Sequence, residues 1–181
     1  MKFEITTYGN PVLKKKAVPV GKIDDSIKQL ARDMLDTMYS SNGLGLAAEQ
    51  VGHTESICVI DLPASMDVDD VTKQRSNPDV KMPIIMLNPV IDKMEGVQVG
   101  QEGCLSFPEI FVTIKRAAKV EVRFKDLSGK DAVLAVSGLL ARTVQHEVDH
   151  LNGMLLVNRM SPVQKLSNAG KLKKLKKDNK K

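Results

Sequence analysis

Residues 144–153 read VQHEVDHLNG and contain the side chains of a possible metal site. His146 and His150 lie four positions apart, and Glu147 directly follows the first histidine. On a helix, two imidazoles one turn apart can bind one ion, and the neighbouring carboxylate can reach a water on that ion. The same pattern also occurs as two ordinary helix histidines, on the surface or in the core. Because two histidines alone hold a divalent ion poorly, a third ligand elsewhere decides between this alternative and a metal centre.

The sequence after this motif does not supply that ligand. In the two metalloprotease patterns that share HEXXH, the third ligand is a histidine or a glutamate further along the chain. No histidine follows His150, and no glutamate follows Glu147. This absence argues against both protease patterns, and the remaining candidate ligands lie upstream: His53, Cys58, Cys104 and several carboxylates.

The upstream candidates differ in their surroundings. Cys58 lies inside the apolar run SICVI, where a small buried thiol is ordinary packing. His53 lies in the polar segment VGHTES, which favours a loop. Cys104 lies in GQEGCLSFP, a composition typical of an exposed turn. On composition alone, Cys104 can be a metal ligand, a reactive nucleophile or a quiet structural thiol.

The helix that carries the histidines is predicted over residues 137–153. Its apolar positions form one stripe, and the two histidines and Leu139 lie together on the flank of that stripe. A second amphipathic helix is expected within residues 24–43, and strands at 56–60, 84–88, 97–100, 119–125 and 131–136. We therefore expect an α+β fold of short, mainly antiparallel strands around a buried HEXXH helix, with an N-terminal helix and a basic C-terminal helix.

Length and composition favour one soluble domain. A chain of 181 residues with 42% hydrophobic residues can bury one core, and no apolar run is long enough to span a bilayer. Two cysteines and no recognisable signal segment favour a reducing, cytoplasmic location. Residues 62–83 are polar and unpatterned, which predicts a long surface loop.

The basic charge is concentrated at the C-terminal end. Residues 161–181 contain eight lysines and one aspartate, whereas residues 1–160 contain 19 basic and 21 acidic residues. We therefore divide the chain into a nearly neutral catalytic domain, 1–160, and a basic helix or tail, 161–181. Ser161 and Pro162 are typical of the start of a helix.

Three segments, in this order, resemble the signature motifs of peptide deformylases: GLGLAAEQ at 43–50, EGCLS at 102–106 and QHEVDH at 145–150. The resemblance runs from YGNPVLKKKA near the start to NRMSPVQK near the end. These enzymes remove the formyl group from the N-terminal methionine of new bacterial proteins. The resemblance implies a hydrolase that acts on N-formylmethionyl nascent peptides.

The resemblance also implies roles for individual residues. Cys104, His146 and His150 correspond to the metal ligands. Glu147 corresponds to the general acid/base, which activates the metal-bound water for attack on the formyl group. Gln50 and the backbone N–H of Leu105 correspond to the donors that bind the developing oxyanion.

Substrate binding and the metal are implied in the same way. The residues expected to contact the substrate are Leu44, Gly45, Gly103 and Leu139. Sulfur and nitrogen ligands in a tetrahedral site would suggest zinc by default. The family instead works best with ferrous iron (Fe2+), accepts nickel or cobalt, and is usually poor with zinc.

The basic tail resembles a C-terminal helix that docks beside the exit tunnel of the ribosome, and its charge would favour a polyanion such as RNA. We expect neither a membrane partner nor sequence-specific DNA binding. The alternatives are a zinc endopeptidase and a non-catalytic ribosome-associated protein. Two departures from the family are the long segment 62–83 and Glu49, where proline or a small residue is more usual.

Overall fold

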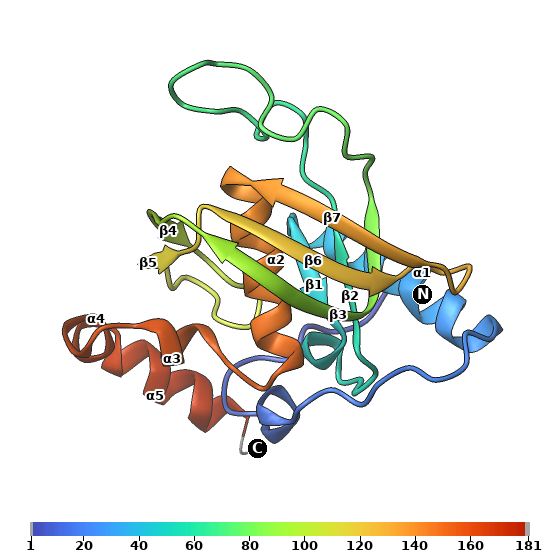
Figure 1. The fold of residues 1–181 in the computed structure, drawn as a ribbon. Helices are drawn as coiled ribbons and strands as arrows, with labels where there is room; N and C mark the ends of the chain where they lie inside the picture. The colour runs from blue at the N-terminus through green and yellow to red at the C-terminus, as the bar shows by residue number, and fades with distance from the viewer. Residues whose placement is uncertain (1, 180–181) are drawn as a thin grey trace.

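The computed structural model describes residues 2–179 (Figure 1). None of its helices combines the length and the apolar character needed to cross a membrane. The α-helices are α1 (Asp25–Ser40), α2 (Gly138–Leu151), α3 (Leu156–Arg159), α4 (Pro162–Ser167) and α5 (Ala169–Asp178), and the short 3-10 helices are η1 (Pro11–Lys14) and η2 (Ala48–Val51). The strands are β1 (Gly45–Ala47), β2 (Ile57–Ile60), β3 (Ile84–Glu95), β4 (Gln98–Glu102), β5 (Val112–Arg116), β6 (Lys119–Lys125) and β7 (Asp131–Ser137).

Five strands form one antiparallel sheet in the order β1-β2-β3-β6-β7. The long strand β3 pairs with β2 through its first residues and with β6 along most of its length, with two register irregularities that bend it. Strands β4 and β5 form a separate antiparallel pair. The predicted fold class, α+β with mainly antiparallel strands, is therefore confirmed.

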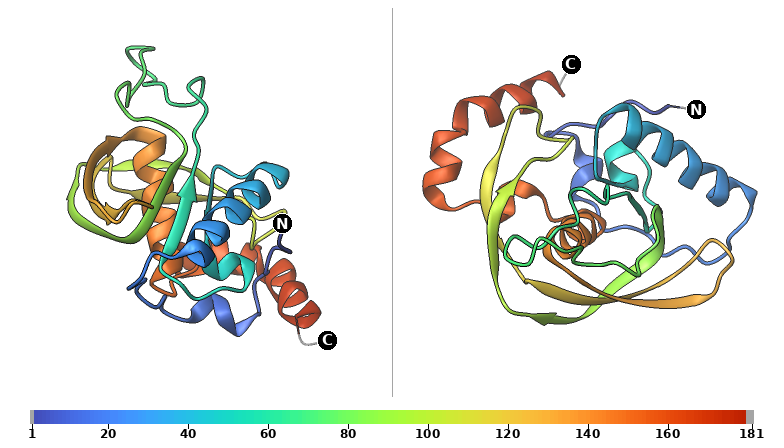
Figure 2. Two further views of the ribbon diagram at one scale, coloured as in Figure 1. Left: turned by 90° about the vertical axis from the view of Figure 1, so that its right-hand side faces the viewer. Right: turned by 90° about the horizontal axis from the view of Figure 1, so that it is seen from above.

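Helix α2 lies at the centre of the molecule and is seen end-on in the right-hand view of Figure 2, with the sheet curving around it. Its apolar stripe packs against the sheet in the largest core cluster, which includes Val122, Leu140 and Val144. Part of the polar sector of the helix is buried as well, since Arg142 and Gln145 are each only 5% exposed. The backbone leaves the helix at Gly153, whose φ of +70° suits glycine.

Helix α1 covers another part of the sheet and confirms the predicted N-terminal helix. Asp24 caps its start by accepting hydrogen bonds from the backbone N–H groups of Ser26 and Ile27. Its buried face packs with β2 and η2 in a second cluster that includes Leu30, Met34 and Ile57. The predicted strands are all present, whereas β1 and β5 were not predicted.

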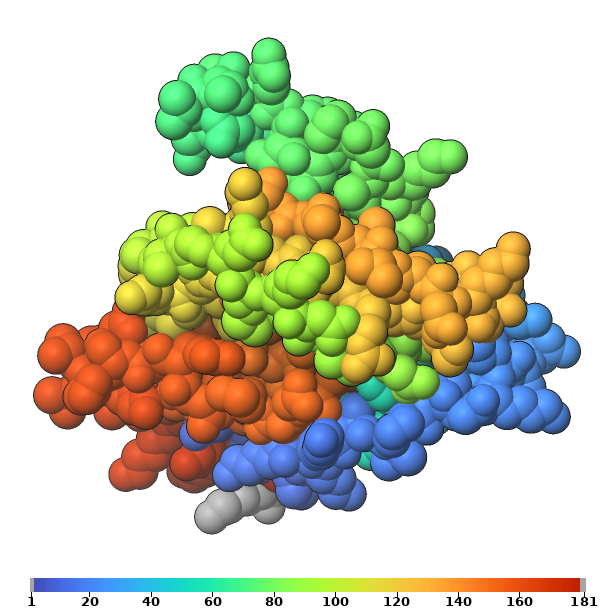
Figure 3. Space-filling model, in the orientation of Figure 1, coloured from blue at the N-terminus to red at the C-terminus, as the bar shows by residue number. Residues whose placement is uncertain are grey.

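Segment 62–83 contains no helix or strand and protrudes from the body at the top of Figure 3. This agrees with the predicted surface loop. Two of its polar residues are nevertheless buried, Asp67 at 1% and Asn77 at 6% exposure. The segment is thus organised by internal polar contacts even though it has no regular secondary structure.

The basic C-terminal segment is helical and packs on the body. Ser161 caps α4 and Pro162 occupies its first turn, as predicted. The single predicted helix is, however, two helices, because α4 ends at Ser167 and Asn168 separates it from α5. Leu172 of α5 is buried in a third cluster with Tyr8 and Phe107. The division of the chain at residue 160 stays a prediction; Lys180 and Lys181 of the tail lie outside the described residues.

Candidate metal centre

The three predicted metal ligands converge in space. The ligand atoms of Cys104, His146 and His150 all lie within 4.8 Å of one another, and no other such cluster occurs within residues 2–179. The Cys104 Sγ lies 3.3 Å from His150 Nε2. The two histidines occupy successive turns of α2, whereas Cys104 comes from the loop after β4. A thiolate and two imidazoles at this spacing fit a divalent transition metal with a further position free for a reactant.

His146 is oriented by a buried ionic network that the sequence analysis did not predict. Its Nδ1 lies 3.0 Å from Glu102 Oε2, which leaves Nε2 available as the ligand atom. Arg116 donates two hydrogen bonds to the Glu102 carboxylate, and Arg142 donates a third at 2.8 Å. Glu102 is the first residue of the EGCLS motif, and this position was the only feature of the sequence that pointed to its contact with His146. Arg116 and Arg142 carried no such signal.

The network determines the charges beside the ligands. Burial alone would raise the pKa of Glu102, but hydrogen bonds from His146 and Arg116 outweigh burial and hold this pKa well below its usual range. Glu102 is therefore an anion at neutral pH. Burial would lower the pKa of His146, yet its interactions with Cys104 and Glu102 raise it. A carboxylate on the distal imidazole nitrogen makes the other nitrogen a stronger ligand.

Glu147 lies against β1 beside the ligands. A Cβ added at Gly45 would come within 2.3 Å of Glu147 Oε1, so the glycine provides the space that the carboxylate occupies. Glu147 is 3% exposed, and its Oε2 has no hydrogen-bond partner among the described residues. Burial raises the pKa of Glu147 to about 7. A carboxyl group with this pKa can both accept and return a proton near neutral pH.

Gln50 is fixed so that its amide N–H₂ faces the ligands. Its Oε1 accepts a hydrogen bond from the Ala47 backbone N–H at 2.9 Å. Its Nε2 then points towards Cys104 Sγ at 3.5 Å and Ser106 Oγ at 3.3 Å. The side chain is buried, at 1% exposure. A held amide donor next to the ligands is suited to binding an oxygen that becomes negative.

A cavity of about 480 Å³ opens onto these groups. It is lined by nine predicted site residues: Leu44, Gly45, Gln50, Gly103, Cys104, Leu105, Leu139, His146 and Glu147. His150 does not line it and is itself buried, at 1% exposure. Phe111 also lines the cavity and was not predicted. It packs over Gly103, where an added Cβ would come within 2.7 Å of its ring.

These features define a class of protein. A three-ligand metal centre beside a carboxyl group of raised pKa, at the end of an open cavity, is the arrangement of metal-dependent hydrolases. Comparison with known proteins is more specific. The family profile described as polypeptide deformylase matches residues 2–166.

Individual relatives agree with this match. A peptide deformylase of Thermosynechococcus vestitus is 46% identical over 153 residues, covering 84% of this chain and 75% of that protein. One of Orientia tsutsugamushi is 40% identical over 174 residues, covering 95% of this chain and 94% of that protein. The crystal structure of a peptide deformylase from Legionella pneumophila matches with a TM-score of 0.83 and 36% identity, covering 100% of this chain and 99% of that one.

The chain belongs to the polypeptide deformylase family. The predicted resemblance is thereby confirmed, and so is the enzyme class, a hydrolase that removes N-formyl groups from new proteins. Neither alternative, the zinc endopeptidase or the non-catalytic protein, is favoured. Metal dependence agrees with the Cys104, His146 and His150 cluster.

Proposed function

We propose that this chain removes the N-formyl group from the formylmethionine of newly synthesised proteins, in the cytoplasm, by a water that Glu147 activates. One observation carries the proposal: Glu147, Gln50, Cys104 and His146 line a single cavity, and the ligand atom of His150 lies within 4.8 Å of those of Cys104 and His146. Each of these groups matches one requirement of amide hydrolysis, namely a nucleophilic water, a proton acceptor and a donor for the oxyanion.

Cys104, His146 and His150 would hold the metal ion. When bound, such an ion acts as a Lewis acid that lowers the pKa of a coordinated water. The cluster fits this purpose because Glu102 fixes the His146 tautomer and because imidazole binds iron and nickel as well as zinc, so the choice among these metals follows the family resemblance. We propose Fe2+ as the working metal, with nickel or cobalt as active substitutes and zinc as a poorer one.

The proton steps fall to Glu147. With a pKa raised to about 7 by burial, its carboxylate takes a proton from the attacking water and returns it to the leaving amine. Negative charge develops on the formyl oxygen during attack. Gln50 Nε2 and the backbone N–H of Leu105 donate to that oxygen, and losing one such donor typically costs about 2.7 to 4 kcal/mol of transition-state stabilisation.

The substrate's methionine is assigned to the apolar part of the cavity. Leu44 and Leu139 line it from two different elements, the segment before β1 and the first turn of α2. Gly103 and Gly45 leave room on the adjoining walls of the cavity, since a Cβ at Gly103 would collide with Phe111 and a Cβ at Gly45 with Glu147. We propose that the peptide enters past these glycines with its formyl group at the ligands.

Formate release tests the proposal directly. The metal-loaded chain and a Glu147→Gln variant are incubated with formyl-Met-Ala-Ser and with the unformylated peptide, and formate and internal cleavage are both measured. Formate from the wild type alone, without internal cleavage, supports the proposal. Internal cleavage would support an endopeptidase, and formate from the variant at the wild-type rate would exclude the role of Glu147.

Metal substitution tests the choice of ion. Protein purified in air should lose activity as the iron oxidises and regain it when nickel is added. Full, air-stable turnover with zinc alone would contradict the assignment to Fe2+.

We also propose that the basic C-terminal helices bind the ribosome near the exit tunnel. Lys173, Lys174 and Lys177 are exposed on α5, while Leu172 and Asn179 tie the helix to the body. Exposed cations on a helix that is already packed suit an RNA surface. Because deletion would also remove the packing of Leu172, charge removal is the cleaner test.

The triple variant Lys173→Gln, Lys174→Gln and Lys177→Gln should lose salt-sensitive co-sedimentation with ribosomes and keep its turnover of formyl-Met-Ala-Ser. A matched control removes three exposed lysines of the body by Lys2→Gln, Lys22→Gln and Lys130→Gln. Equal co-sedimentation of both triple variants would contradict a specific role for the tail.

A further inference from the structure

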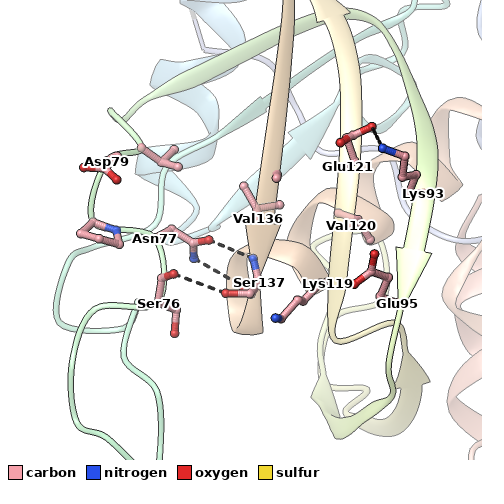
Figure 4. A pocket seen from close by; sticks show the side chains of 13 residues that line it. Ser76, Asn77, Asp79, Lys93, Glu95, Lys119, Val120, Glu121, Val136 and Ser137 are labelled. Atoms are coloured by element: carbon pink, nitrogen blue, oxygen red, sulfur yellow. Dashed lines mark hydrogen bonds and ion pairs between the residues drawn. The ribbon is translucent and has the colours of Figure 1, made fainter.

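A buried amide links the protruding segment 62–83 to the start of the metal-binding helix. Ser137 ends β7 and directly precedes α2. Its backbone N–H donates to Asn77 Oδ1 at 2.9 Å, and Asn77 Nδ2 donates to the Ser137 carbonyl at 3.1 Å. Figure 4 shows the Asn77 side chain pointing at Ser137, with both bonds drawn.

This pair of bonds replaces a missing strand. Strand β7 is the last strand of its sheet, so no neighbour occupies the edge that faces away from β6. A primary amide carries the same donor and acceptor as a peptide group, and Asn77 therefore satisfies both backbone groups of Ser137 as a strand would. The Ser137 side chain makes no capping bond to α2 and instead donates to the Ser76 carbonyl at 3.4 Å.

Asn77 is itself held in place by the carboxylate of Asp67. Its Nδ2 donates to Asp67 Oδ1 at 2.6 Å and its backbone N–H to Asp67 Oδ2 at 3.1 Å. Arg75 adds a further hydrogen bond to the same carboxylate at 3.2 Å. Asp67 is 1% and Asn77 6% exposed, so the amide presented to Ser137 is both oriented and shielded from water.

Within the described part of the chain, residues 62–83 make hydrogen bonds to one residue outside the segment, Ser137. This leaves aside the hydrogen bonds between paired strands. Beside this link lies a cleft of about 380 Å³, between the base of the segment and strands β3, β6 and β7 (Figure 4). Leu62, Val80 and Met82 anchor the two ends of the segment by apolar packing on the main core cluster. The bonds to Ser137 are the hydrogen-bonded link across the cleft, and no parallel set of hydrogen bonds would replace them.

The link is two residues from the substrate cavity. Gly138 follows Ser137 with a φ of +60°, which turns the chain from β7 into α2. Leu139 comes next and lines the cavity, as does Thr143 one turn later, whose Oγ1 donates to the Leu139 carbonyl at 2.9 Å. The orientation of this first turn thus depends on how the residue before it is held.

We infer that Asn77 is a positioning residue for the methionine pocket: by fixing the Ser137 backbone it sets the place of Leu139, so that segment 62–83 contributes to substrate selectivity without touching substrate. This inference rests on the proposed function, because it assigns the Leu139 side of the cavity to methionine. Its signature is a change in preference between substrates and not a general loss of activity.

The test compares kcat/KM for formyl-Met-Ala-Ser with kcat/KM for formyl-Ala-Ala-Ser on the metal-loaded enzyme. An alanine side chain does not reach Leu139, so a displaced Leu139 affects the first substrate only. In Asn77→Ala the ratio should fall by roughly tenfold, since fitting one methylene in an apolar pocket is worth roughly 10- to 200-fold. Unfolded or metal-free molecules cancel from this ratio because both substrates meet the same population.

Three further variants make the result decisive. Gln74→Ala removes an exposed side chain of the same segment and should leave the ratio unchanged. Asp67→Asn weakens the support of Asn77 without touching Ser137 and should give a smaller fall, which covers the case in which Asn77→Ala does not fold. In a Leu139→Ala background, Asn77→Ala should have no further effect on the ratio, because coupled residues are not additive.

An unchanged ratio in both Asn77→Ala and Asp67→Asn would overturn the inference and leave the proposed function intact. An undiminished effect in the Leu139→Ala background would also overturn it, because Asn77 would then act elsewhere. A wild type that releases no formate from either peptide would remove the proposed function and this inference together.

Discussion

Glu49 is a buried acid without a hydrogen-bond partner, and replacing it should change how stability depends on pH. It is 0% exposed, and neither of its carboxylate oxygens has a partner in hydrogen-bonding geometry within residues 2–179. Burial raises the pKa of Glu49 to about 8; the charges of Glu147 and Glu55 add to this, and its own backbone N–H opposes it. We predict that Glu49→Gln makes the protein less sensitive to rising pH.

The size of the effect follows from proton linkage. An unfolded glutamate titrates near 4.5 and the folded Glu49 near 8, so the folded state holds an extra proton between these values. The stability that Glu49 contributes is complete below its pKa in the unfolded state. It decreases as the pH rises above that value and is lost once the pH passes the pKa in the folded state, about 8. At 1.36 kcal/mol per pKa unit, the wild type should lose roughly 3 kcal/mol of unfolding free energy between pH 5.5 and pH 8 through this residue.

Urea denaturation at pH 5.5, 7 and 8, with equal metal content in every sample, measures this loss. Glutamine has a similar size and no titration, so the unfolding free energies of wild type and Glu49→Gln should diverge steadily with pH. Titrating groups that do not interact with Glu49 cancel in the difference between the two proteins. Glu4→Gln, at an exposed position, is the control and should follow the wild type. If Glu49→Gln lost as much stability as the wild type over this range, the residue would not be a neutral buried acid.

Three further predictions concern the site and its supports. Glu102→Gln should weaken metal binding by roughly 10- to 100-fold, measured by competition with a chelator, because His146 loses an anionic partner; unchanged affinity would refute the orienting role. Gly45→Ala should lower kcat by at least roughly 100-fold, because its Cβ would displace Glu147 and a displacement of about 1 Å can reduce the rate this much. Circular dichroism should show that the variant remains folded. Full activity would show that the carboxylate can move aside. Leu172→Ala should cost about 2 to 4 kcal/mol in urea denaturation, since Leu172 is buried between α5 and the body; a loss below about 0.5 kcal/mol would mean that the helix contributes no packing.

Local sequence determined the parts of this protein that depend on near neighbours. The four-residue spacing of His146 and His150 places both on one flank of a helix whatever surrounds it, and the apolar stripe beside them predicts burial. Helix α1 and the β6–β7 hairpin were predictable for the same reason, since capping, turn residues and periodicity act within one or two turns of chain. Residue types alone left three readings open for Cys104.

Tertiary structure decided everything that depends on distant segments. Cys104 joins the histidines only because the β4–β5 pair brings its loop against α2, and the Glu102, Arg116 and Arg142 network is assembled from three separate elements. Strand β1 has three residues, too few for a pattern, and it forms because β2 pairs with it. Asn77 reaches Ser137 across 60 positions. Such contacts depend on how loops close and on which faces of the elements are buried against each other. The spacing of residues within one element predicts neither of these.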